Sequence, residues 1–90
     1  MMYRLNLFPY EINGMQIEDD FYYIITSFIP GNGEIIEKIK VCVENDNEET
    51  DDYLLKVKVK EVHYEIFDDC SSMPILYGQV IGVKKVESDE

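Results

Sequence analysis

Two long segments of this chain alternate apolar and charged residues with a period of two. The first covers residues 34–44, and its apolar face is formed by Ile35, Ile39, Val41 and Val43. The second begins at residue 53, where Leu55, Val57 and Val59 alternate with Lys56, Lys58 and Lys60. A period of two is the side-chain period of a β-strand with one buried face. The sequence therefore predicts antiparallel strands whose lysines face solvent.

The second segment continues to residue 67, but its apolar parity changes on the way. After Glu61 the apolar residues are Val62, Tyr64 and Ile66, which have the parity of the lysines. An extra residue in the strand, a β-bulge, would turn both apolar sets toward one core. Bends of this kind close small barrels and let one strand serve two sheets. We therefore expect a bent long strand, with the bend near residues 60–61.

Turn chemistry places the shorter strands. Pro9 has no backbone N–H, so residues 3–12 form an edge strand or a strand with a break, with core candidates Leu5, Leu7 and Tyr10. Asn13 and Gly14 both tolerate the positive φ of a type I′ turn, which predicts a hairpin that returns over residues 15–18. The last strand covers residues 75–86, where two glycines, Gly78 and Gly82, mark bends.

Residues 21–29 fit two kinds of structure. Their apolar residues have helical spacing, and they are Phe21, Ile24, Ile25, Phe28 and Ile29. Most side chains of the segment are nevertheless aromatic or β-branched, which favours a strand. The sequence therefore predicts an all-β fold, either an antiparallel meander of five to six strands or a small barrel. The alternative is an α+β fold with a short helix at residues 20–29.

The 90 residues correspond to one domain, which we expect at residues 1–86, followed by an acidic tail at 87–90. The formal charge of −11 disfavours binding to nucleic acid or to anionic membranes and favours basic surfaces. No apolar run approaches the roughly 18 residues of a membrane span, and no signal-peptide core is present, so we expect a cytoplasmic protein. The two cysteines, Cys42 and Cys70, are too few for a disulfide framework, although one bridge between them stays open.

Catalytic chemistry is hard to assemble from this sequence. The only histidine, His63, lies within a strand, and no sequence feature places it beside Cys70 or the adjacent serines. The acidic residues 45–52 lack the order of a calcium-binding loop, and a zinc ligand set would be incomplete. We therefore expect no enzyme activity, no metal site and no cofactor.

The carboxylates gather in turns and loops. In a meander, the Asn13–Gly14 turn, the loop at residues 45–52 and the C-terminal tail would emerge at one end of the sheet. This end is our candidate partner-binding surface, formed by Glu18, Asp19, Asp20, Glu44, Asp46, Glu48, Glu49, Asp51 and Asp52.

These observations favour a non-enzymatic acidic module that docks on a basic surface of a partner protein. One form of it is an inhibitor or modulator that mimics nucleic acid and blocks a DNA- or RNA-binding protein. Phosphate-mimicking inhibitors from phages and mobile elements act in this way, and the comparison rests on size and charge alone. The alternative is a small β-barrel subunit that binds a larger complex through apolar surface and strand edges.

Overall fold

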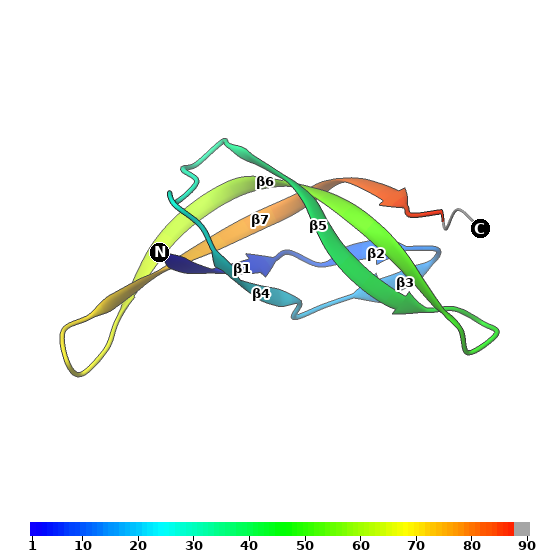
Figure 1. Ribbon diagram of the computed structural model, residues 1–90, viewed down its shortest axis with the longest axis horizontal. Helices are drawn as coiled ribbons and strands as arrows, with labels where there is room; N and C mark the ends of the chain where they lie inside the picture. Colours follow the sequence, from blue (N-terminus) through cyan, green and yellow to red (C-terminus); the bar gives the residue numbers. More distant parts are fainter. Residues whose placement is uncertain (88–90) are drawn as a thin grey trace.

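The computed structural model describes residues 1–87 and contains seven β-strands (Figure 1). They are β1 (Met2–Leu7), β2 (Tyr10–Ile12), β3 (Met15–Ile17), β4 (Phe21–Ile25), β5 (Ile35–Glu44), β6 (Thr50–Ile66) and β7 (Ser72–Lys85). No helix occurs among the described residues, so the alternative with a short helix at residues 20–29 is wrong. The preference of the aromatic and β-branched side chains for a strand prevails there. Of the expected acidic tail, only Glu87 is among the described residues; residues 88–90 lie outside them.

Five strands form one mixed sheet in the order β4-β1-β7-β6-β5, and β2 and β3 form a separate two-stranded sheet. β1 runs parallel to β7, whereas the other neighbours in the large sheet are antiparallel. The fold is therefore not the expected meander, and the large sheet does not close into a barrel. The interruption after β1 explains the difference, because the chain leaves the sheet at Pro9, forms the β2–β3 hairpin and returns as β4 beside β1.

The core lies between the curved large sheet and the β2–β3 hairpin, over which β6 and β7 arch in Figure 1. The buried side chains are Tyr3, Leu5, Leu7, Tyr10, Ile12, Ile39, Val41, Tyr53, Leu55, Val57, Val59 and Leu76. The expected core positions on β1 and β2 are thus confirmed. The molecule is elongated, with extents of 47 × 22 × 22 Å.

The predicted hairpin turn is confirmed. Asn13 and Gly14 have φ angles of 52° and 81°, and Ile12 pairs with Met15 across the turn. Positive φ at both central residues is the requirement of a type I′ turn.

The bend predicted in β6 is present, because its register with β7 shifts between Val59 and Glu61. Val62 packs against the core after this bulge, as expected. Tyr64 and Ile66 do not, and they are 64% and 72% exposed. The reason is the length of the neighbouring strand. β1 pairs with β7 only over Ile75–Gly78, so no strand flanks the β6–β7 hairpin from residue 74 toward its turn.

Two details of the β5–β6 hairpin differ from the predictions. The register of β5 is irregular between Ile36 and Ile39, so Ile35 is exposed instead of sharing the buried face of Ile39. The connecting loop is also shorter than residues 45–52, since β6 already begins at Thr50. Thr50–Asp52 pair with the end of β5, and this pairing holds a polar segment in a strand.

Candidate functional site

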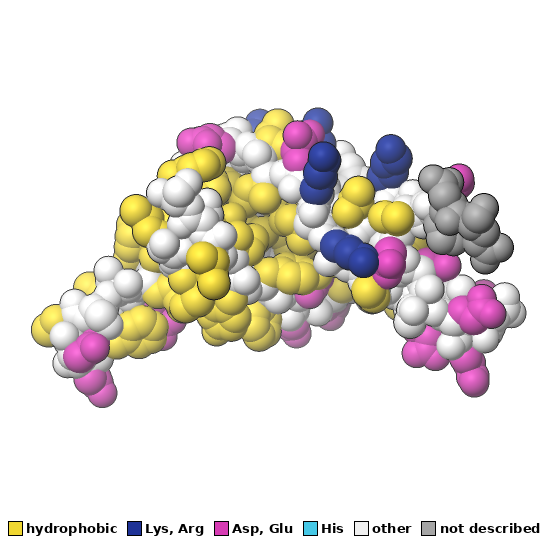
Figure 2. Space-filling view, in the orientation of Figure 1, with side chains coloured by type: hydrophobic (Ala, Val, Ile, Leu, Met, Phe, Trp, Pro, Cys, Tyr) yellow, Lys and Arg dark blue, Asp and Glu magenta, His cyan; other side chains and the backbone are white. Residues whose placement is uncertain are grey.

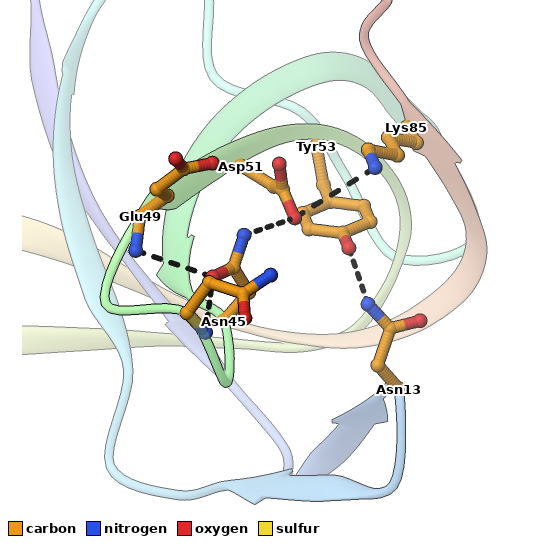
Figure 3. Close-up of polar contacts among 7 residues, drawn as sticks. Asn13, Asn45, Glu49, Asp51, Tyr53 and Lys85 are labelled. Carbon is orange, nitrogen blue, oxygen red and sulfur yellow. Dashed lines mark hydrogen bonds and ion pairs between the residues drawn. The ribbon is translucent and has the colours of Figure 1, made fainter.

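The β5–β6 turn carries the densest acidic segment of the chain. We call residues 44–52 the acidic turn; its carboxylates are those of Glu44, Asp46, Glu48, Glu49, Asp51 and Asp52. Asn45 organises it (Figure 3): Asn45 Oδ1 accepts hydrogen bonds from the amides of Asn47 at 2.9 Å and Glu49 at 3.2 Å. Asn45 Nδ2 donates to Asp51 at 3.2 Å. The carboxylates are therefore carried by a turn with a defined conformation.

The acidic turn does not stand alone at this end of the molecule. Asn13 Nδ2 donates a hydrogen bond to the hydroxyl of Tyr53, at the base of the turn (Figure 3). The amide of Val86 donates to the carbonyl of Asp52 at 2.8 Å, which fixes the end of β7 beside it. The Asn13–Gly14 turn, the acidic turn and the end of β7 thus lie at one end of the molecule, although the sheet is not a meander. The tail that we also expect there lies outside the described residues beyond Glu87.

Basic residues neutralise part of the acidic turn. Lys40 pairs with Asp52 at 3.3 Å, and Lys85 pairs with Asp51 at 3.7 Å. The Cys42 thiol also donates to Asp52 at 2.9 Å; this contact and Lys40 lower the pKa of the carboxyl, and the same hydrogen bond raises the pKa of the thiol. No ion pair within residues 1–87 reaches Asp46, Glu48 or Glu49, whose side chains are exposed. The free negative charge is therefore concentrated at the tip.

Glu18, Asp19 and Asp20 belong to a different region. They connect β3 to β4, and the carbonyl of Asp20 accepts a hydrogen bond from the amide of Leu7. The Asp20 carboxylate accepts two more, from the hydroxyls of Tyr10 at 2.7 Å and Tyr22 at 2.9 Å. Burial, followed by these contacts with Asp20, raises the pKa of both tyrosines. The predicted acidic surface is therefore split in two, and Asp20 has structural contacts at the edge of the core.

A second surface lies at the opposite end, and the sequence reasoning missed it. We call residues 64–74 the arm; it is the part of the β6–β7 hairpin beyond the reach of β1. Its apolar side chains Tyr64, Ile66 and Phe67 are exposed by 64%, 72% and 43%. Three carboxylates and no basic residue accompany them. The signal in the sequence is the parity of Tyr64 and Ile66, which predicts core positions instead of exposed ones.

The turn of the arm has its own polar support. Asp69 Oδ1 accepts hydrogen bonds from the amide of Ser71 at 3.0 Å and from its hydroxyl at 2.5 Å, and these lower the pKa of Asp69. The amide of Phe67 donates to the carbonyl of Ser71 at 2.9 Å. The arm thus holds its apolar side chains on an ordered hairpin.

Apolar side chains also gather beside the arm on the face of the sheet that points away from the core. Phe21, Tyr23 and Ile25 of β4 are exposed there, and the Arg4 guanidinium lies 4.3 Å from the ring centre of Phe21. The Phe8 and Tyr77 rings stack at 6.2 Å. In Figure 2 hydrophobic side chains cover much of one half of the molecule, lysines lie over the middle, and acidic side chains mark both projecting ends.

Groups that would support catalysis or metal binding are dispersed. His63 Nε2 lies 3.5 Å from the Glu61 carboxylate, and its ring contacts Tyr77 edge-on. Cys42 and Cys70 are both free and exposed. Across residues 1–87 no cluster of three or more His, Cys, Asp or Glu side chains is arranged to hold a metal ion. The same residues include no helix that is long and apolar enough to cross a membrane.

Comparison of this chain with protein-family models, with curated proteins and with solved structures finds no match.

Proposed function

We propose that this protein is a non-enzymatic binding module that docks its arm on a partner protein. The exposure of Tyr64, Ile66 and Phe67 at the end of a projecting hairpin is the observation that carries the proposal. Exposed apolar side chains that gather in one region of a surface are typical of interaction sites. Aromatic side chains are also enriched among the residues that dominate binding energy.

The charge of the arm defines its partner. Glu65, Asp68 and Asp69 neighbour the apolar residues in the chain, and no lysine or arginine lies within residues 64–74. A complementary surface is apolar at its centre and basic at its rim. The proposed partner is basic, as we expect from the charge, and it is bound through apolar surface, as we expect for an assembly subunit. The free thiols of Cys42 and Cys70 fit a location in the reducing cytoplasm.

A second candidate uses the acidic turn. Asp46, Glu48 and Glu49 are exposed and unneutralised among the described residues, and Asn45 holds their backbone in place. Carboxylates with fixed spacing can occupy the phosphate sites of a DNA- or RNA-binding protein, which then loses access to nucleic acid. This candidate is the inhibitor expected from the charge of the chain.

Affinity capture from the source organism identifies the partner, and two variants then separate the candidates. The arm variant replaces Tyr64, Ile66 and Phe67 with serine. The turn variant replaces Glu48 and Glu49 with lysine, and leaves Asp51 and Asp52 unchanged because they pair with Lys85 and Lys40. Both sets are exposed, so thermal unfolding verifies that each variant keeps its fold.

The arm proposal predicts that the serine variant weakens binding at least about tenfold, whereas the lysine variant changes it much less. Affinity should also fall only modestly between about 50 and 300 mM salt, because apolar contact dominates. Full binding by the arm variant, with loss in the turn variant and a steep salt dependence, would instead establish the acidic turn as the binding surface.

A further inference from the structure

The two edges of the large sheet are unequally protected. Proteins guard exposed edge strands with charges, prolines or bulges, because free backbone groups otherwise pair with other chains. The β5 edge carries Glu37, Lys38 and Lys40, and Lys38 has a φ of 63° at its register irregularity. β4 has the sequence Phe-Tyr-Tyr-Ile-Ile and pairs with β1 in continuous register. It therefore has no charge, no proline and no bulge.

The backbone groups that β4 leaves free follow from its pairing with β1. The amide of Leu7 donates to the carbonyl of Asp20, and the amide of Thr26 donates to the carbonyl of Met1. Hydrogen-bonded positions alternate along an antiparallel strand, so the even-numbered residues between Asp20 and Thr26 bond to β1. The N–H and C=O groups of Phe21, Tyr23 and Ile25 consequently point to the open edge.

We propose that this edge pairs with β4 of a second copy of the chain, antiparallel, about a two-fold axis at Tyr23. In this register the backbone of Tyr23 faces its own copy and that of Phe21 faces Ile25. These are the positions whose hydrogen-bonding groups are free, so each donor meets an acceptor. A two-fold interface requires such self-complementarity. The sheets of the two copies become continuous.

The side chains are self-complementary in the same register. Phe21 faces Ile25 of the second copy on the outer side of the sheet, and Tyr22 faces Ile24 on the core side. Each pair joins an aromatic residue with a β-branched one, a combination that stabilises neighbouring strands. A slip by one residue would place exposed residues opposite half-buried ones, which disfavours that register.

Charge allows this contact despite the net charge of −11. The acidic residues that directly precede β4 in the chain are Asp19 and Asp20, which the two-fold places opposite Ser27 and Thr26 of the second copy. Carboxylates thus face neutral hydroxyl groups and not each other.

The interface is small, since it consists of one five-residue strand from each copy. Stable complexes bury about 800 Å² per partner, so we expect a dimer that dissociates on dilution. This inference goes beyond the proposed function and does not depend on it, because it concerns the isolated protein and the β4 edge, not the arm.

Sedimentation equilibrium of the purified chain at increasing concentration tests the pairing. The apparent mass of the wild type should rise from that of one chain toward that of two. Tyr23→Pro removes an N–H that points to the open edge and makes no bond to β1, a place where edge strands tolerate proline. It should raise the dissociation constant about tenfold or more, because the symmetric interface loses the contact twice.

Glu44→Pro is the matched control on the other edge. The amide of Asn45 donates to the carbonyl of Glu49, and hydrogen-bonded positions alternate along an antiparallel strand, so the amide of Glu44 points away from β6. Replacement of Glu44 by proline should therefore leave the dimer unchanged. Tyr23→Lys is a second variant that places two lysines opposite each other at the axis; it should also dissociate the dimer while thermal unfolding stays close to the wild type. A wild type that remains monomeric at all concentrations overturns the inference. The inference is also overturned if both Tyr23 variants are folded and still form dimers.

Discussion

The two ends of β6 are parts of one continuous strand, yet they have different surroundings. Toward Thr50 the strand lies between β5 and β7 and turns Tyr53, Leu55 and Val57 into the core. Toward Ile66 it pairs with β7 alone and leaves its apolar side chains in water. The residue types on the two halves are similar. Burial is therefore decided by how far the neighbouring strands extend, and the apolar surface of the arm is a consequence of the short β1.

The largest expected difference between the two halves is in core packing. Leu55 is 1% exposed, and Leu55→Ala should lower the free energy of unfolding by about 2–5 kcal/mol. Ile66 is 72% exposed, and Ile66→Ala should stay within about 0.5 kcal/mol of the wild type. Urea unfolding measures both. Comparable losses of unfolding free energy in the two variants would show that Ile66 is packed as Leu55 is, and would contradict the contrast between the two halves of β6.

The two glycines of β7 give a second comparison, between a position that faces the core and one that faces a lysine. A Cβ atom at Gly78, where β7 lies beside β1, would be 2.3 Å from Val57 Cγ1. Gly78→Ala should therefore cost about 1–3 kcal/mol through overpacking. Gly82 lies opposite Lys56, and its Cβ would be 3.4 Å from Lys56 Cβ, so Gly82→Ala should have a smaller effect. Thermal unfolding of both variants distinguishes them, and equal shifts would mean that the two glycines are packed alike.

The two turns give a smaller contrast. Asn45→Ala removes three hydrogen bonds from the acidic turn and should lower the free energy of unfolding by about 1 kcal/mol. Asp69→Ala removes the contacts to Ser71 in the arm, which can fray without opening the core, so its effect should be smaller. Amide hydrogen exchange should show faster exchange at Ser71 in Asp69→Ala and no change at the base of the acidic turn.

The smallest effect is expected in the alkaline range. Burial and Asp20 raise the pKa of Tyr10 above its ordinary value of 10.0. The stability that the Tyr10 hydroxyl contributes is complete below the pKa it has in the unfolded chain. It is lost as the pH rises toward the higher pKa of the folded protein, because only the unfolded chain releases the proton in this range. Tyr10→Phe should thus be less stable at neutral pH, yet lose less stability than the wild type between about pH 9 and 11. Parallel pH profiles in thermal melts would contradict this assignment.

Local chemistry explains which parts of the fold were predictable. Asn13–Gly14 specifies its own turn, Pro9 ends its own strand, and the parity change at Lys60 specifies a bulge. The neighbours of a strand are not encoded locally, so the parallel pairing of β1 with β7 was missed. The polar side chains of Thr50–Asp52 predict a loop, but cross-strand pairing with β5 holds these residues in β6.

The candidate sites divide in the same way. The carboxylates of the acidic turn follow from their position in sequence, whereas the separation of Asp20 from them depends on its contacts with Tyr10 and Tyr22. The arm was not predicted, because the exposure of Tyr64 and Ile66 depends on the length of β1 and not on their own pattern.

The pairing of β1 with β7 also determines when the molecule can be completed. Arg4 pairs with Ile75, so the middle of the sheet joins segments that are about seventy residues apart in the chain. During synthesis, β1 must remain without its partner until β7 has left the ribosome, while the local β2–β3 hairpin can already form. Closure of so long a loop is slow, and we expect folding in milliseconds to seconds, with the β6–β7 hairpin assembled before β1 docks onto it.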